Sequence, residues 1–203
     1  MLLFSLFNKK PNMDAVFQAT DNLAKKTCSL GLQLFIKQEL TKEKLYLNAN
    51  EFTRVDAVVF ATFLNQCVIL TAAKDRNLAQ EVTTRYASFV YQILEEDGGS
   101  MYGDAIPART IRALIDNRFS FYTEILQSKA DAGTGIAAIM EEFELIIKTD
   151  IINGKFQEFS SHSPLPILNF DDDWRCSVEA RNFPKFMNEV LDAPMQALLK
   201  LIQ

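Results

Sequence analysis

Two pairs of acidic residues are spaced so that each could present two carboxylates on one face of a helix. Glu141 and Glu144 are three residues apart, as are Glu189 and Asp192. Residues at this separation are neighbours on a helix surface, and carboxylate oxygens are ligands that Mg²⁺ accepts in proteins. Metal-assisted hydrolysis is therefore the one catalytic chemistry that the sequence leaves open.

The form of these pairs resembles the metal sites of the all-helical nucleotide pyrophosphohydrolases. The resemblance covers these four residues, and it implies a Mg²⁺ site and a nucleotide substrate. With 26 acidic residues among 203, chance alone gives about three acidic pairs at this spacing. We therefore assign no metal site or cofactor from the sequence, and we keep a Mg²⁺-dependent pyrophosphohydrolase as an alternative.

The chain has too few histidines and closely spaced cysteines for most other common catalytic and metal-binding sites. His162 is the only histidine, in a stretch rich in serine and proline, whereas triads, zinc sites and His-ligated haem need imidazoles held in packed structure. The cysteines Cys28, Cys67 and Cys176 are far apart, without the Cys-x-x-Cys spacing of zinc or redox sites. We interpret them as buried free thiols in a reducing compartment, which favours a cytoplasmic location.

A line of polar residues interrupts the most apolar segment of the chain. Residues 57–73 carry no charge, and within them Thr62, Asn65 and Gln66 have the spacing of one narrow helix face. Buried amides need partners, so we expect hydrogen bonds to other helices that set the register of the bundle. A polar edge on a ligand cavity, lined by some of the sixteen Phe, and an oligomer interface are the alternatives.

Three arginines follow a loop that contains glycine. Arg109, Arg112 and Arg118 could form an anion site, but no phosphate-binding glycine motif accompanies them. Asp116 lies four residues after Arg112, which is the spacing of an ion pair within one helix. We therefore interpret these three arginines as part of a charged helix face that is exposed to solvent.

The segment 160–182 differs from the rest of the chain. It contains two prolines, the acidic run 171–173 and the only tryptophan, and long irregular segments in compact domains are often functional. Aromatic side chains on such segments are favoured at protein contacts. Phe170 and Trp174 are therefore our candidate partner-binding residues.

The elements that must position these residues are amphipathic helices joined by short connections. Asn12 or Asp14 can cap a helix that runs to about Leu40, and Asn48 and Glu51 form a capping box for the next helix. Further helices are predicted from Leu78 to the glycines at 98–99, from Pro107 to about Gln127, from Ile136 to about Asn153 and from Pro184 to Ile202, with at most a short helix near 172–180. The sequence predicts one all-α domain over 1–203, an antiparallel bundle of five or six helices with a long irregular segment before the last.

The charge and hydropathy of the chain limit the classes of partner that we expect it to bind. The formal net charge is −5, with 21 basic and 26 acidic residues and no basic stripe, so we expect no nucleic-acid partner. The uncharged segment 57–73 is better explained by a central buried helix than by a membrane span. Residues 1–11 are interpreted as an apolar lead-in that packs on the bundle rather than as a signal peptide or membrane anchor.

The absence of other chemistry and the acidic surface together favour a non-enzymatic cytoplasmic protein. We expect it to act by binding a protein partner, such as a basic helix, or by forming a homo-oligomer. A binder of an apolar small molecule in a cavity beside Thr62, Asn65 and Gln66 is the first alternative, and the Mg²⁺-dependent enzyme is the second.

Overall fold

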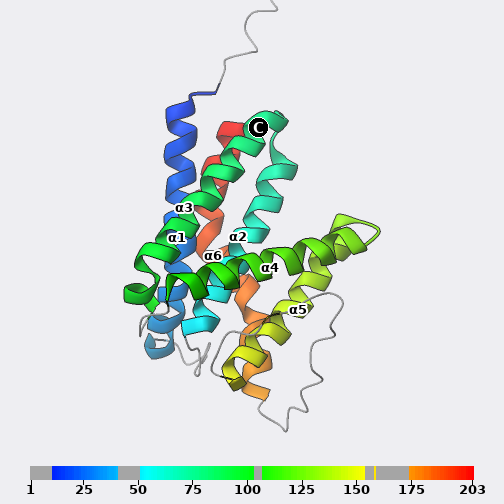
Figure 1. The fold of residues 1–203 in the computed structure, drawn as a ribbon. Coiled ribbons are helices and arrows are strands. Elements are labelled where there is room, and N and C mark those ends of the chain that lie inside the picture. Colours follow the sequence, from blue (N-terminus) through cyan, green and yellow to red (C-terminus); the bar gives the residue numbers. More distant parts are fainter. Residues whose placement is uncertain (1–10, 41–50, 103–106, 154–157, 159–173) are drawn as a thin grey trace, which may run out of the picture.

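The fold is a bundle of helices, as the sequence predicts. The computed structural model describes residues 11–40, 51–102, 107–153, 158 and 174–203, and these residues form no strand (Figure 1). The described helices are α1 (Met13–Leu40), α2 (Glu51–Ala72), α3 (Arg76–Tyr102), α4 (Ala108–Ser128), α5 (Ala132–Asn153) and α6 (Trp174–Ile202). Residues 1–10 of the expected lead-in 1–11, the capping residue Asn48 and the segment 159–173 lie outside the described residues.

Side-chain caps account for the starts of several helices. The Oδ1 atom of Asn12 accepts a hydrogen bond from the amide of Asp14 at 3.1 Å, which confirms the first of the two predicted caps. Asp75 accepts one from the amide of Asn77 at 2.8 Å, and Asp131 accepts one from the amide three residues on at 2.9 Å. Such bonds satisfy N–H groups that have no partner within the helix.

The helix α2 is the centre of the bundle. It packs against α1, α3, α4, α5 and α6, and the side chains from Val55 to Asn65 are all buried. By length and composition, Arg54–Ala72 is the one candidate membrane span within the described residues, but 67% of it is buried inside the bundle. Its apolar composition is therefore explained by its position in the core, as the sequence analysis expects.

Short turns join two pairs of neighbouring helices. Residues 73–75 connect α2 to α3, and residues 129–131 connect α4 to α5. The amide of Lys74 donates to the carbonyl of Ile202 at 3.4 Å, so the C-terminus of α6 lies beside the first of these turns. Figure 1 shows α4 crossing the direction of α1 and α3 rather than running along it.

Aromatic rings join four helices in the core. Phe60 of α2 stacks on Phe143 of α5 with ring centroids 3.9 Å apart. It also contacts Tyr122 of α4 edge to face at 5.9 Å and Phe183 of α6 at 6.0 Å. Aromatic pairs in such geometries stabilise a fold beyond the apolar area they bury.

Three helix ends differ from the sequence-based predictions. The helix α5 begins at Ala132 rather than at Ile136, and the carboxylate of Asp131 caps it. The helix α3 continues through Gly98 and Gly99 to Tyr102 instead of stopping at the glycines, because glycine permits a left-handed cap without requiring one. The helix α6 begins at Trp174 rather than near Pro184, and it contains both Pro184 and Pro194. The predicted irregular segment 160–182 is therefore wrong from residue 174 onward.

Burial explains why α6 tolerates two prolines. Each proline removes one backbone hydrogen bond from a helix interior. The helix nevertheless buries one apolar stripe against the bundle, which is formed by Phe183, Phe186, Met187, Leu191, Met195, Leu198 and Ile202. Tertiary packing of such a stripe supplies most of the stability of a helix in a protein.

Candidate functional site

A buried chain of hydrogen bonds links α1, α2 and α3. The Nδ2 atom of Asn65 donates to the hydroxyl of Tyr86 at 2.8 Å. That hydroxyl lies 2.8 Å from Oγ1 of Thr27, which itself donates to the carbonyl of Leu23 at 2.9 Å. Because Thr27 has a single hydroxyl proton, Tyr86 must donate to Thr27. Asn65 thus forms the inter-helix hydrogen bonds that we expect from the sequence.

The other two residues of the predicted polar line have different surroundings. Thr62 is fully buried and returns its hydroxyl to the carbonyl of Val58 at 2.7 Å within its own helix. Gln66 is only partly buried. Asn65 and Thr62 nevertheless both interact with the Tyr86 hydroxyl of α3, and each of these interactions lowers the pKa of that phenol against the larger effect of burial.

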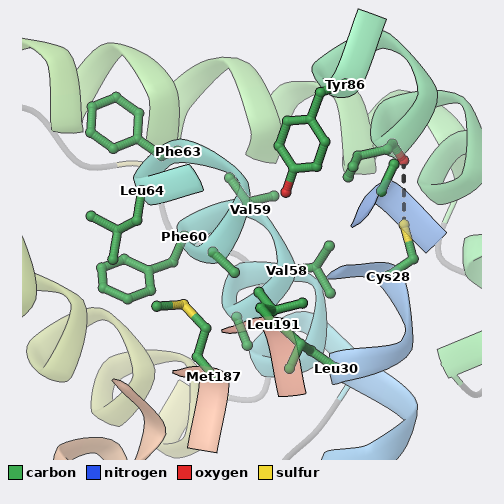
Figure 2. Close-up of a cluster of buried hydrophobic side chains, with 14 of the residues drawn as sticks. Cys28, Leu30, Val58, Val59, Phe60, Phe63, Leu64, Tyr86, Met187 and Leu191 are labelled. Carbon is green, nitrogen blue, oxygen red and sulfur yellow. Dashed lines mark hydrogen bonds between the residues drawn. The ribbon is translucent and has the colours of Figure 1, made fainter. Parts of the chain in front are cut away.

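Burial makes the nearby ionisable groups less reactive. The pKa of Tyr86 is raised because its phenol is desolvated in the core. Burial also raises the pKa of the Cys28 thiol to about 12, and its Sγ atom contacts the carbonyl of Val90 at 3.9 Å (Figure 2). Cys67 is a second free thiol whose pKa is raised by burial. These groups are held in their neutral forms, which are poor nucleophiles.

An apolar pocket of about 240 Å³ lies between α2, α5 and α6, and Asn65 is one of its lining residues. Figure 2 shows part of its wall, where Met187 of α6 is directed towards Phe60 and Leu64 of α2. We call this the apolar pocket, and its lining residues are Leu64, Asn65, Val68, Ile136, Met187, Asn188, Leu191, Asp192 and Met195.

Most of this pocket is not evident from the sequence. Among its lining residues, Asn65 and the candidate metal ligand Asp192 are marked by sequence patterns, whereas the methionines of α6 and Ile136 of α5 are not. The spacing of Met187, Leu191 and Met195 at four-residue steps was a visible signal, but that spacing is typical of any buried helix face. Only the tertiary structure shows that Val68, on the same pocket, stays 39% exposed.

The candidate metal ligands do not form a cluster. Within the described residues, which include Glu141, Glu144, Glu189 and Asp192, no group of three or more His, Cys, Asp or Glu side chains is placed to hold a metal ion. The two pairs lie on α5 and α6. The four-carboxylate arrangement of a helical Mg²⁺ site is therefore not assembled by this fold.

The three arginines also do not form one anion site. Arg118 is completely buried and holds both carboxylate oxygens of Asp56, with N···O distances of 2.7 and 3.1 Å. Arg112 is paired with Glu95 of α3 rather than with Asp116. The prediction of a solvated charged face is thus wrong for Arg118, because its partner on α2 lies in the core.

The proposed partner-binding residues are only partly within the described structure. Phe170 lies outside it, and Trp174 is the first residue of α6. Trp174 is thus not part of an irregular segment, contrary to the sequence-based expectation. Its role in binding stays a prediction.

A larger hollow lies over α1 and α3. Its volume is about 770 Å³, and its lining includes Phe17, Asp21, Lys25 and Arg85. Arg85 donates to both carboxylate oxygens of Asp21 at 2.8 and 2.7 Å and lies 4.7 Å from the centre of the Phe17 ring. Arg85 and Asp21 are thus paired with each other at this hollow.

Comparison with known proteins gives no further guidance. No family model matches the chain, and no curated protein or solved structure is significantly similar to it.

Proposed function

We propose that this protein acts by binding another protein at the apolar pocket. The observation that carries the proposal is an apolar opening at the surface of the bundle. Val68 on α2 is 39% exposed at the pocket, and Met140, one turn along α5 from the lining residue Ile136, is 36% exposed. Exposed apolar surface around a concavity is typical of interaction sites.

The size of the pocket favours side chains of a macromolecule over a whole small ligand. Pockets for drug-sized molecules usually occupy about 300–1,000 Å³, and this one has about 240 Å³. The phenylalanines that could have lined a larger cavity pack on one another instead, as Phe60 does on Phe143.

Methionine gives the pocket an adaptable surface. Met187 and Met195 line it, and Met140 lies close by on α5, so three of the six methionines of the chain belong to this region. Methionine is unbranched and polarisable, and protein surfaces that accept varied partners use it frequently. A partner that inserts apolar side chains is therefore well matched to this lining.

Site-specific photo-crosslinking in cells of the native host tests the proposal. A photoreactive phenylalanine analogue replaces Val68, and the matched control carries it at Leu70 of the same helix. Leu70 is 46% exposed and does not line the pocket, and two residues correspond to about 200° around a helix axis. We expect a protein adduct of defined mass from position 68 only. No adduct, or the same adduct from both positions, would refute the proposal.

A further inference from the structure

The apolar pocket is lined by both buried and exposed residues. Those that are at most 9% exposed are Leu64, Asn65, Met187, Leu191 and Met195. Val68, Asn188 and Asp192 are exposed. A group that enters past the exposed residues therefore contacts buried, mostly apolar side chains. This arrangement suits one inserted side chain rather than an extended contact surface.

The volume and the sulfur atoms of the pocket favour an aromatic ring. A volume of about 240 Å³ equals that of about eight water molecules at ~30 Å³ each, which is close to the size of one aromatic side chain. Met187 and Met195 both line the pocket, and Figure 2 shows the Met187 side chain directed into this region. Methionine sulfur makes favourable contacts with aromatic rings.

An unused hydrogen-bond acceptor belongs to the same lining. Asn65 is 5% exposed, and its Nδ2 atom donates to the hydroxyls of Tyr86 and Thr27 at 2.8 and 3.4 Å. Its Oδ1 atom accepts no hydrogen bond from the described residues and is not sealed from solvent. The pocket is the opening that Asn65 lines. Covering this oxygen with a group that has no donor costs its hydration, so an occupant with a donor is favoured.

We propose that the apolar pocket receives one tryptophan side chain of the partner protein, whose indole N–H donates to Oδ1 of Asn65. The inference depends on the proposed function, because it names the side chain that the partner inserts. Asn65 is the only polar residue among the buried lining residues that the structure describes. Indole matches it, since indole has a large apolar ring and one donor but no acceptor that burial would leave unsatisfied. Phenylalanine lacks the donor, and tyrosine adds an acceptor. Tryptophan is also enriched among the side chains that dominate binding at protein interfaces.

Small analogues of a tryptophan residue test this chemistry. The probe is N-acetyltryptophan amide, and the main control is N-acetylbenzothienylalanine amide, which has the same fused-ring shape with sulfur in place of the N–H group. The corresponding tyrosine and leucine amides are further controls. In full-length protein with isotope-labelled methionine methyl groups, NMR titration should show saturable ring-current shifts at Met187 and Met195 but not at Met13 of α1. We expect the benzothienyl control to bind roughly threefold to tenfold more weakly, as for the loss of one neutral hydrogen bond. Equal or tighter binding of any control, shifts of equal size at Met13, or no saturable shift would overturn the proposal.

Matched variants at exposed positions of α2 locate the binding site. Val68→Ser removes apolar contact at the pocket, whereas Leu70 does not line it. We expect Val68→Ser to weaken binding of N-acetyltryptophan amide by roughly threefold, as for the loss of one apolar contact, and Leu70→Ser to leave it unchanged. Equal effects of the two changes would assign the probe to another surface and overturn the proposal.

The outcomes separate this inference from the proposed function. If the photoreactive residue at position 68 captures a protein in cells but N-acetyltryptophan amide does not bind, the tryptophan proposal fails and the binding function stands. If position 68 captures no protein, the binding function fails and this inference fails with it. Sedimentation velocity tests the other occupant, since self-association lost in Val68→Ser but kept in Leu70→Ser would assign the pocket to a second copy and overturn the proposal of a separate partner.

Discussion

Asn65 is placed where a hydrogen-bond chain and the apolar pocket meet. Its amide nitrogen reaches the hydroxyl of Tyr86 at 2.8 Å and that of Thr27 at 3.4 Å, and the same residue lines the pocket. A buried polar group that is bonded to other helices favours one register of packing over its alternatives. The side chain thus contributes to the arrangement of the helices that form the pocket.

Replacing Asn65 with leucine should destabilise the protein. The change leaves the Tyr86 hydroxyl without its donor in the core, so we expect the free energy of unfolding to fall by about 1–3 kcal/mol. Urea denaturation measures the difference, and Gln66→Leu, at the partly exposed neighbouring position, should change stability by less than about 0.5 kcal/mol. A neutral or stabilising Asn65→Leu would mean that the hydrogen bond to Tyr86 contributes little.

The buried thiol of Cys28 should make stability depend on alkaline pH. Its pKa is about 9.0 when unperturbed and about 12 in the folded protein. Above pH 9 the unfolded chain loses the thiol proton while the folded chain keeps it, so unfolding is favoured as pH rises towards 12. The free energy of unfolding should fall by up to about 1.4 kcal/mol per pH unit from this group.

Denaturation curves at several pH values between 8 and 10 (about one unit either side of the unperturbed value) measure this dependence. We expect a shallower fall for Cys28→Ala than for the unsubstituted protein, whatever its stability at pH 7. The pKa of Tyr86 is raised from 10.0, so its contribution begins at higher pH. Identical slopes for the two proteins would show that Cys28 is not the responsible group.

At the scale of elements, one buried ion pair joins α2 to α4. Asp56 and Arg118 are both completely buried, and the guanidinium holds both carboxylate oxygens. The amide oxygen of Asn117 accepts a further hydrogen bond from Arg118 at 2.7 Å. A buried pair of this kind restricts how the two helices can pack, because a shifted helix leaves a charge unpaired.

Removing one partner of this pair should cost far more than removing both. Arg118→Met alone leaves Asp56 buried without its counter-charge, and we expect a loss of about 3–5 kcal/mol. The double change Asp56→Leu and Arg118→Met should recover most of that loss in a urea-denaturation cycle. The exposed pair of Arg112 and Glu95 gives the comparison, because Arg112→Ala should cost less than about 1 kcal/mol. A double variant as unstable as Arg118→Met would contradict this account.

At the scale of the whole molecule, α2 and the rings around Phe60 connect all parts of the bundle. Phe60 contacts rings from α4, α5 and α6, and α2 also packs on α1 and α3. A fold whose central helix packs on every other described helix should unfold as one unit, because the loss of α2 removes a neighbour from each of them. We expect a single cooperative unfolding transition.

Truncating Phe60 tests this central role. Phe60→Ala should lower the free energy of unfolding by about 3–5 kcal/mol, since it removes buried apolar contacts and leaves a cavity. Leu70→Ala, at an exposed position of the same helix, should cost less than about 1 kcal/mol. Circular dichroism and tryptophan fluorescence should report the same midpoint in each protein. Separate midpoints would show that α6, which begins at Trp174, unfolds independently.

The sequence by itself determined the all-α class, most helix boundaries and the central position of α2. These follow from local patterns: the apolar periodicity, the cap at Asn12 and the uncharged run 57–73 act within one helix or one turn. The end of α3 and the starts of α5 and α6 differ from the sequence-based predictions, because glycine and proline only bias the local backbone and packing decides the outcome.

The tertiary structure alone decided the partners of side chains and the location of the candidate site. Asp56 and Arg118 are 62 residues apart in sequence, and no local pattern relates them. The apolar pocket combines residues of α2, α5 and α6, each of which has an ordinary helical spacing. Whether such a face is fully covered or left open depends on how three helices cross, and that is a property of the packed chain.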